Sequence, residues 1–130
     1  MKTSVAGLAI ENGKVFIARR LAGGDMGGKW EFPGGKVEEN ESCEEAIVRE
    51  FLEEFGVRVR CGALLAESHF EHHDVVRTLK AYRVCFSPRD AVLREHSEWR
   101  WASAEEIGAL DFTPSDLALL PLLDTCSTGP

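Results

Sequence analysis

The sequence lacks closely spaced cysteines, long apolar runs and an excess of positive charge, and each absence disfavours a class of protein. Its four cysteines (Cys43, Cys61, Cys85 and Cys126) are scattered without a CxxC pair, which disfavours a zinc site and favours reduced thiols in a cytoplasm. No apolar run approaches the roughly 20 residues that cross a bilayer, and no basic segment followed by an apolar run opens the chain, so we expect neither membrane insertion nor a signal peptide. The net charge of −7 disfavours binding to polymeric nucleic acid, which requires a basic patch.

The length and the order of the expected elements indicate one domain. A chain of 130 residues suits one hydrophobic core, and no repeat or linker divides it. We predict a single domain over residues 1–124 and a disordered tail over residues 125–130. The order of hairpin, loop, helix, strands and closing helices predicts an α+β sandwich with helices on both sides of a mixed, curled sheet. Nothing in the pattern demands more than a monomer or a weak homodimer.

Residues 35–57, which read GKVEENESCEEAIVREFLEEFGV, predict a helix that follows a glycine loop. Ser42, with Glu45 three residues later, forms a capping box. Gly56 suits the position just after a helix, so the helix is expected to run from Cys43 to Phe55. One arc of this helix is apolar and is expected to face the core; it comprises Ile47, Val48, Phe51, Leu52 and Phe55.

The remaining elements are expected from turns, caps and alternation. Asn12-Gly13 lies between two apolar runs, residues 4–11 and 14–20, and predicts a β-hairpin because both turn residues accept a positive φ. Further strands are expected at residues 30–32, 57–70, 75–88 and 98–101, with a mobile glycine-rich loop over residues 21–28. Two more helices are expected to begin later in the chain. Ser103 with Glu106 forms a capping box, and Thr113-Pro114 places a proline at the first helical position.

Three glutamates lie on a separate stripe of the central helix. Glu50, Glu53 and Glu54 stand at positions i, i+3 and i+4, where like charges repel by roughly a few tenths of a kcal/mol per pair. Arg49 is placed to brace one carboxylate of the helix, not three. The stripe is either a solvated acidic face or a site for a divalent metal, because Mg²⁺ prefers oxygen ligands and combines carboxylates with substrate phosphates.

The spacing of the charged and glycine positions favours the metal site. It resembles the signature of the Nudix hydrolases at Gly35, Glu41, Arg49-Glu50-Phe51, Glu53-Glu54 and Gly56-Val57. The preceding residues 29–35, KWEFPGG, resemble the MutT-like branch of that family. The resemblance covers most of the chain and is strongest over residues 15–57. Phe51 departs from the pattern, because the family usually has a smaller aliphatic residue at this core position.

The resemblance implies a Nudix-like α/β/α sandwich and a set of metal ligands. Mg²⁺, or alternatively Mn²⁺, would be held by the Gly34 carbonyl and by the carboxylates of Glu50, Glu53 and Glu54. A bound cation with nearby Arg and Lys side chains reverses the sign of an acidic site, so a polyphosphate substrate is compatible with the net charge.

The resemblance also implies roles around the metal. Glu53 and Glu95 are the candidates for the general base that takes a proton from water. Glu95 corresponds to a loop glutamate of the MutT-like branch, for which Glu98 is a second candidate. Arg49 would orient a carboxylate of the catalytic group rather than touch substrate, while Glu41 and Gly35 would hold the loop to the helix.

Four residues are candidates for binding substrate, each with a plainer alternative. Arg20 ends a strand, and Phe32 is either core or a platform for a base. His72 lies in a turn, where histidines are usually solvent-exposed. For Asp116 the plainer role is a favourable charge at the positive end of a helix. The resemblance places Arg20 against the nucleotide, Phe32 against the base and Asp116 at the base edge. A carboxylate there accepts from the amino group of cytosine or from the N–H face of an oxidised guanine.

The resemblance implies a nucleoside triphosphate pyrophosphohydrolase that releases a nucleoside monophosphate and pyrophosphate. The expected substrates are 8-oxo-dGTP, in sanitising the nucleotide pool, or CTP and dCTP. An alternative is cleavage of ADP-ribose or a dinucleotide. A Nudix domain that senses nucleotides without cleaving them is an alternative of another class, although such domains typically lose signature glutamates and this chain keeps them all. An acidic Ca²⁺-binding or interaction protein would leave the glycine loop unexplained.

Overall fold

The computed structural model describes residues 2–123, in which eight strands form two sheets of four. The first sheet is mixed, because β1 pairs parallel with β7 and the other neighbours are antiparallel. Its order is β5-β1-β7-β6, with bounds Gly34–Lys36, Lys2–Leu8, Val75–Cys85 and Arg60–His72. The second sheet is antiparallel and has β3 (Lys14–Arg20) paired with three strands: β2 (Ile10–Glu11), β4 (Trp30–Glu31) and β8 (His96–Ala102). The expected tail, residues 125–130, lies outside the described residues.

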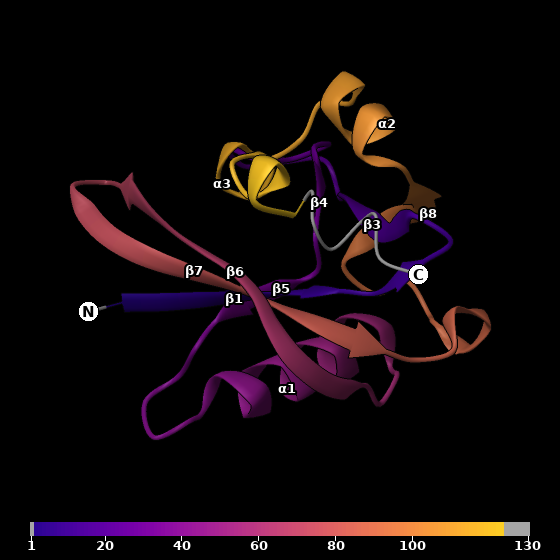
Figure 1. Cartoon of the computed structure of the whole chain (residues 1–130), viewed down its shortest axis with the longest axis horizontal. Helices are drawn as coiled ribbons and strands as arrows, with labels where there is room; N and C mark the ends of the chain where they lie inside the picture. The colour runs from indigo at the N-terminus through magenta and orange to yellow at the C-terminus, as the bar shows by residue number, and fades with distance from the viewer. Residues whose placement is uncertain (1, 124–130) are drawn as a thin grey trace.

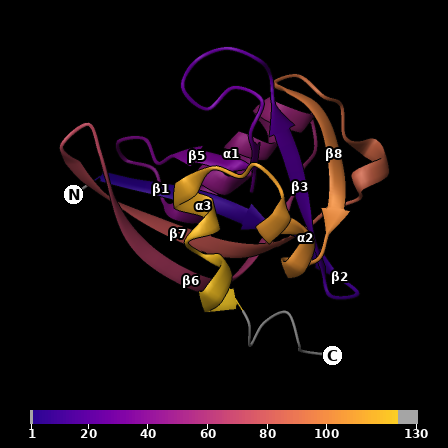
Figure 2. The ribbon, with the colours of Figure 1, turned by 90° about the horizontal axis from the view of Figure 1, so that it is seen from above.

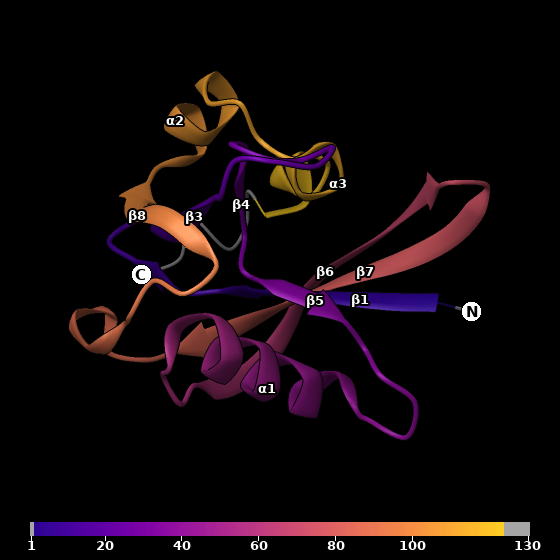
Figure 3. The same cartoon turned by 180° about the vertical axis from the view of Figure 1, so that it is seen from behind.

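Helices cover both sides of the first sheet (Figure 1). The long helix α1 (Cys43–Phe55) lies on one side, and the short helices α2 (Ala104–Ala109) and α3 (Pro114–Leu117) lie on the other, as the reverse view in Figure 3 also shows. Two 3-10 turns, Pro88–Asp90 and Leu120–Leu123, complete the described elements. The predicted α+β sandwich is confirmed, with the difference that its sheet is divided in two. No helix within residues 2–123 is long and apolar enough to cross a membrane.

The N-terminal hairpin is much shorter than the sequence suggests. Asn12 and Gly13 have φ values of 52° and 74°, as the predicted turn requires. Only two residue pairs follow that turn, because β2 and β3 pair at Ile10 with Val15 and at Glu11 with Lys14. The chain then breaks, and β1 enters the other sheet between β5 and β7, so that β1 and β3 run in different directions in Figure 2. The apolar run of β1 is therefore that of a central strand buried on both faces.

Each side of the strands has its own core cluster. In β3, Val15 and Ile17 pack into the cluster on the α2 and α3 side, whereas Phe16 and Ala18 pack into the cluster on the α1 side. Phe16 is fully buried and stacks on Trp99 of β8 at 4.9 Å between ring centroids. Alternate residues of a strand point to opposite faces, so the strand contributes to both layers of the sandwich.

Helix α1 begins and ends as predicted. The Ser42 side chain accepts from Glu45 N, the Glu45 side chain accepts from Ser42 N, and Gly56 closes the helix with a φ of 67°. The expected core face is wrong at one position, since Leu52 is 41% exposed while Ala46 and Glu54 are buried. The buried arc is therefore rotated toward the glutamate stripe, which turns one carboxylate into the protein.

Phe51 is accommodated by a glycine on the adjacent strand. Its ring is fully buried and packs against Phe55 and Phe86 at 5.8 and 5.4 Å between centroids. A Cβ atom added at Gly7 of β1 would overlap the Phe51 ring. The larger side chain at this position of the signature is thus matched by the missing side chain opposite it, and the departure from the family pattern does not disturb the helix.

Candidate active site

Two adjoining cavities lie against both sheets, and the first also borders α3 while the second borders α1. The first has a volume of about 540 Å³ and the second about 380 Å³, and both are lined by Arg20, Glu31 and Gly34. Volumes of this size are typical of small-molecule sites. The first is called here the nucleoside cavity, with Phe32, Arg77 and Asp116 in its wall. The second is called the acidic cavity.

The acidic cavity gathers predicted site residues from three parts of the chain. Glu50 and Glu54 come from α1, Glu95 from the residue before β8, and Gly34 from the start of β5. The structure thus brings together four of the residues that the sequence predicts for metal binding or catalysis. A Cβ at Gly35 would lie 2.5 Å from the Glu50 carboxylate, so only glycine at that position leaves room for Glu50 against the loop.

Glu54 carries the strongest sign of a cation site. The residue is 5% exposed, and its Oε1 atom is buried without a hydrogen-bond partner. Burial, together with the neighbouring Glu50, Glu31 and Glu95, raises the pKa of Glu54 to about 11. A buried carboxylate among other carboxylates is costly unless a positive charge offsets it. The oxygen donors of this cavity fit a divalent cation such as Mg²⁺.

Arg49 holds carboxylates of its own helix and of the loop before it. Its guanidinium donates to both oxygens of Glu41 at 2.7 and 3.0 Å, to Glu50 at 2.8 Å and to Glu53 at 3.0 Å. The expectation that Arg49 braces one carboxylate is therefore wrong, because a guanidinium offers five donors in a planar fork. These bonds hold the pKa of the Glu41 carboxyl below its usual range. Glu53 itself is half exposed on Arg49 and does not line the acidic cavity.

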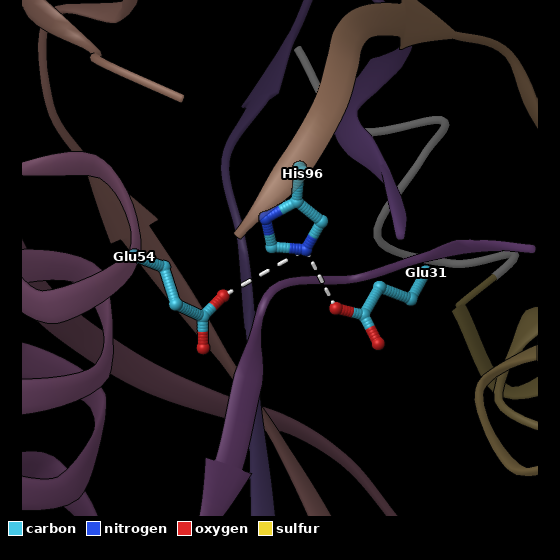
Figure 4. A group of neighbouring side chains, drawn as sticks. All are labelled: Glu31, Glu54 and His96. Carbon is cyan, nitrogen blue, oxygen red and sulfur yellow. Dashed lines mark hydrogen bonds and ion pairs between the residues drawn. The ribbon is translucent and has the colours of Figure 1, made fainter. Parts of the chain in front are cut away.

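Glu31 and His96 belong to the site and have no signal in the sequence analysis. The His96 side chain is almost fully buried, with its Nε2 atom 2.8 Å from Glu31 Oε2 and 3.9 Å from Glu54 Oε1. Figure 4 shows the imidazole between the two carboxylates, which come from β4 and α1. The other Glu31 oxygen accepts from Arg20 at 3.0 Å. The available signal in the sequence was that Glu31 and His96 are polar residues next to apolar residues of their strands. Their proximity in the site depends on the packing of β4 and β8 onto α1.

The nucleoside cavity contains the predicted base-binding residues. Phe32 is 2% exposed and packs edge-on against Phe112, so it serves the core as well as the cavity wall. Asp116 is 7% exposed and accepts from Phe32 N at 3.0 Å. Burial and the neighbouring Glu31 raise the pKa of Asp116 to about 7. His72 lines the cavity at the exposed end of β6.

Pairing between β4 and the segment before α3 brings Asp116 to Phe32. Trp30 N donates to Asp111 O at 2.8 Å, and Thr113 N donates to Trp30 O at 2.9 Å. Thr113 precedes α3 as predicted, with Pro114 at the first position, but its side chain makes no capping hydrogen bond. The placement of Asp116 thus rests on backbone pairing rather than on the expected cap.

We expect alanine at Gly34 and at Gly35 to act in different ways. A Cβ at Gly34 would overlap the backbone of Val5, and rigid overpacking of this kind costs about 1–3 kcal/mol of unfolding free energy. A Cβ at Gly35 would meet only the Glu50 side chain among its nearest atoms, which can turn aside. Urea denaturation should therefore show the larger loss of stability for Gly34→Ala. Addition of Mg²⁺ should raise the unfolding temperature less for Gly35→Ala than for wild type, and an unchanged response would contradict the assigned place of Glu50.

With this geometry in view, the chain is found to match the NUDIX domain family over residues 1–123. The chain belongs to the Nudix family, whose hydrolases generally use a divalent metal. It is similar to the CTP pyrophosphohydrolase of Escherichia coli K12, with 36% identity over 89% of this chain and 86% of that protein. It is also similar to the 8-oxo-dGTP diphosphatase of the same organism, with 36% identity over 82% of each chain. The solution structure of the E. coli ORF135 protein has a TM-score of 0.86 and 34% identity, covering 98% of this chain and 91% of that one.

Proposed function

We propose that this protein is a metal-dependent nucleoside triphosphate pyrophosphohydrolase that releases a nucleoside monophosphate and pyrophosphate. The observation that carries the proposal is the junction of the two cavities at Arg20, Glu31 and Gly34. A nucleotide with its base near Asp116 would extend its phosphates past Arg20 toward the carboxylates of the acidic cavity. The similarity to enzymes named for CTP and for 8-oxo-dGTP supports this class of substrate.

The metal is proposed to be Mg²⁺, with Mn²⁺ as the alternative, held by the Gly34 carbonyl and by Glu50, Glu53 and Glu54. Glu54 has the greatest need of a cation because of its burial and its unpaired oxygen. Glu53 would have to turn from Arg49 toward the cavity. When bound, such a cation lowers the pKa of water and offsets the charge of phosphate oxygens.

The protein side chains supply binding and proton transfer. Arg20, fixed by Glu31, donates to phosphate oxygens at the junction of the cavities. Glu95, which lines the acidic cavity, or Glu53, which is held outside it by Arg49, takes the proton from the attacking water. Arg49 keeps Glu50 and Glu53 in place through its hydrogen bonds and does not contact substrate.

Cytidine triphosphates and 8-oxo-dGTP are the proposed substrates, in keeping with an acceptor at the base edge. The ionised Asp116 accepts from the amino group of cytosine or from the N–H groups of an oxidised guanine. The intact set of glutamates favours an enzyme over a nucleotide sensor. We propose a cytoplasmic monomer or weak homodimer that acts on free nucleotides rather than on nucleic acid polymers.

Pyrophosphate release across a panel of nucleotides tests the proposal. With Mg²⁺ present, we expect turnover of 8-oxo-dGTP, CTP or dCTP and none after removal of the metal by a chelator. The panel includes 5-methyl-dCTP, ADP-ribose and a diadenosine polyphosphate. Cleavage of ADP-ribose alone would replace the proposed substrate class. Tight binding of one triphosphate without release of pyrophosphate would indicate a sensor.

A further inference from the structure

Arg77 projects from β7 into the nucleoside cavity. It stands beside Phe70 of β6 and Lys2 of β1 in the sheet register, and two residues before the buried Leu79. Residues two apart on a strand, and residues directly opposite on neighbouring strands, share a face. Arg77, Phe70 and Leu79 therefore lie on the face toward α3, and all three line the cavity. Figure 1 shows the β6–β7 hairpin passing below α3, with its loop end extending beyond the helix.

Within residues 2–123, the guanidinium of Arg77 has no acidic partner. Its Nε atom is buried and makes no hydrogen bond, and no carboxylate of residues 2–123 lies within ion-pair distance of it. The other arginine of the cavity, Arg20, is paired with Glu31 at 3.0 Å. A half-buried cation with an unsatisfied donor carries a desolvation cost that a ligand acceptor would remove.

The position of Arg77 indicates which part of a nucleotide it meets. Arg20 and Glu31 line both cavities, whereas Arg77 lines the nucleoside cavity alone. Arg77 thus shares the end of the site that holds Phe32 and Asp116, away from the carboxylates of the acidic cavity. The proposed function directs the phosphate chain to the other end, so the acceptors left for Arg77 are those of the nucleoside, of which only the base differs between nucleotides.

We propose that Arg77 determines base specificity by donating to an exocyclic carbonyl oxygen, while Asp116 accepts from an N–H group of the same base. This rests on the proposed function and deepens it. Cytosine, guanine and 8-oxoguanine carry both a carbonyl oxygen and N–H groups. Adenine carries an amino group but no carbonyl, so its nucleotides leave the buried Arg77 donor unpaired and are discriminated against. The adenine end of ADP-ribose is disfavoured for the same reason.

Binding of nucleoside monophosphates tests this inference without depending on turnover. CMP and AMP keep the base and lack the pyrophosphate portion that the acidic cavity would take. By calorimetry we expect the wild type to prefer CMP, and Arg77→Met to weaken CMP binding by roughly 10- to 100-fold, the worth of a hydrogen bond to a charged group. AMP binding should change little. Arg77→Lys keeps the positive charge but lacks the planar set of guanidinium donors, so it should lose part of the preference for CMP over AMP.

Lys80→Met is the matched control, because Lys80 lies on the same strand, on the opposite face and outside both cavities. It should leave both affinities unchanged. Equal weakening of CMP and AMP by Arg77→Met would show a contact to the ribose or phosphate that both share, and unchanged binding by a folded variant would show no contact. Either result overturns the proposal, as does a wild type without preference for CMP. Hydrolysis of CTP with an unaltered base preference in Arg77→Met would leave the proposed function standing. If CMP and AMP bind as predicted but no triphosphate is hydrolysed, the inference about Arg77 would stand and the proposed function would fail.

Discussion

Replacing Glu54 with glutamine is expected to lower pyrophosphate release by on the order of 10³-fold while the protein remains folded. Residues that merely support metal ligands are worth roughly 10–100-fold, and Glu54 is the most deeply buried carboxylate of the acidic cavity. The neutral amide has nearly the same shape, so packing against the ends of β4 and β8 is kept. Steady-state assays with the best triphosphate of the panel measure the loss.

The same variant tests whether the lost activity reflects lost metal binding. A ligand that binds only the folded protein raises its unfolding temperature, so Mg²⁺ should stabilise the wild type and have little effect on Glu54→Gln. In metal-free buffer the variant should be at least as stable as the wild type, because an amide has no charge to bury. Full activity of Glu54→Gln would contradict the proposed metal site.

Two companion variants on the same helix sharpen the result. Glu44→Gln is a control, since Glu44 is exposed in the first turn of α1 and lies outside both cavities; activity and the response to Mg²⁺ should persist. Glu53→Gln separates the two roles proposed for Glu53. Loss of both activity and Mg²⁺ response would indicate a ligand, whereas loss of activity alone would indicate the general base.

Asp116→Asn is expected to raise the free energy of unfolding at pH 8 by up to about 4 kcal/mol, with no gain near pH 3. The pKa of Asp116 is raised from 3.8 to about 7 by burial and by Glu31, against the opposing effects of the Phe32 N–H and Arg20. The unfolded chain is already ionised above about pH 4. The folded protein therefore binds more protons between those values, and wild-type stability falls as pH rises through that window. Above pH 7 the loss is complete.

Urea denaturation of wild type and Asp116→Asn from about pH 3 to pH 8 measures this difference. Asparagine has no charge, and its carbonyl oxygen still accepts from Phe32 N, so the variant lacks the decline attributed to Asp116. The titration of Glu54 also affects stability, but it cancels in the difference between the two free energies of unfolding, because both proteins contain Glu54. Asp111→Asn serves as control, since its exposed pair with Lys29 contributes less than about 1 kcal/mol. A difference in stability that is flat with pH would contradict the buried state of Asp116.

The local features of the site were predictable from sequence because each depends on residues within a few positions. The capping box of Ser42 and Glu45, the left-handed Gly56 and the helix between them appear in the structure at the expected residues. The stripe of Glu50, Glu53 and Glu54 follows from the helical period alone. The glycine loop and the spacing also indicated the family, whose domain the chain matches over residues 1–123.

Other outcomes depended on contacts between distant segments. Glu53 and Glu54 are neighbours with the same chemistry, yet one is half exposed on Arg49 and the other is buried against His96. The long N-terminal hairpin was wrong because a two-residue turn specifies the turn and not the partners of the strands beyond it. The hydrogen bond of Phe32 to Asp116 joins residues 84 positions apart.

The sequence by itself therefore determined helix α1, its caps, its row of carboxylates and the family. The tertiary structure decided which carboxylate is buried, which residues join it and which cation lines the nucleoside cavity without an acidic partner within residues 2–123. The physical reason is that capping and periodicity act within a helical turn, whereas burial is set by the elements that close over a residue. For Glu54 those elements include the ends of β4 and β8, which supply Glu31 and His96. For Arg77 the element is α3, which places Asp116 across the nucleoside cavity.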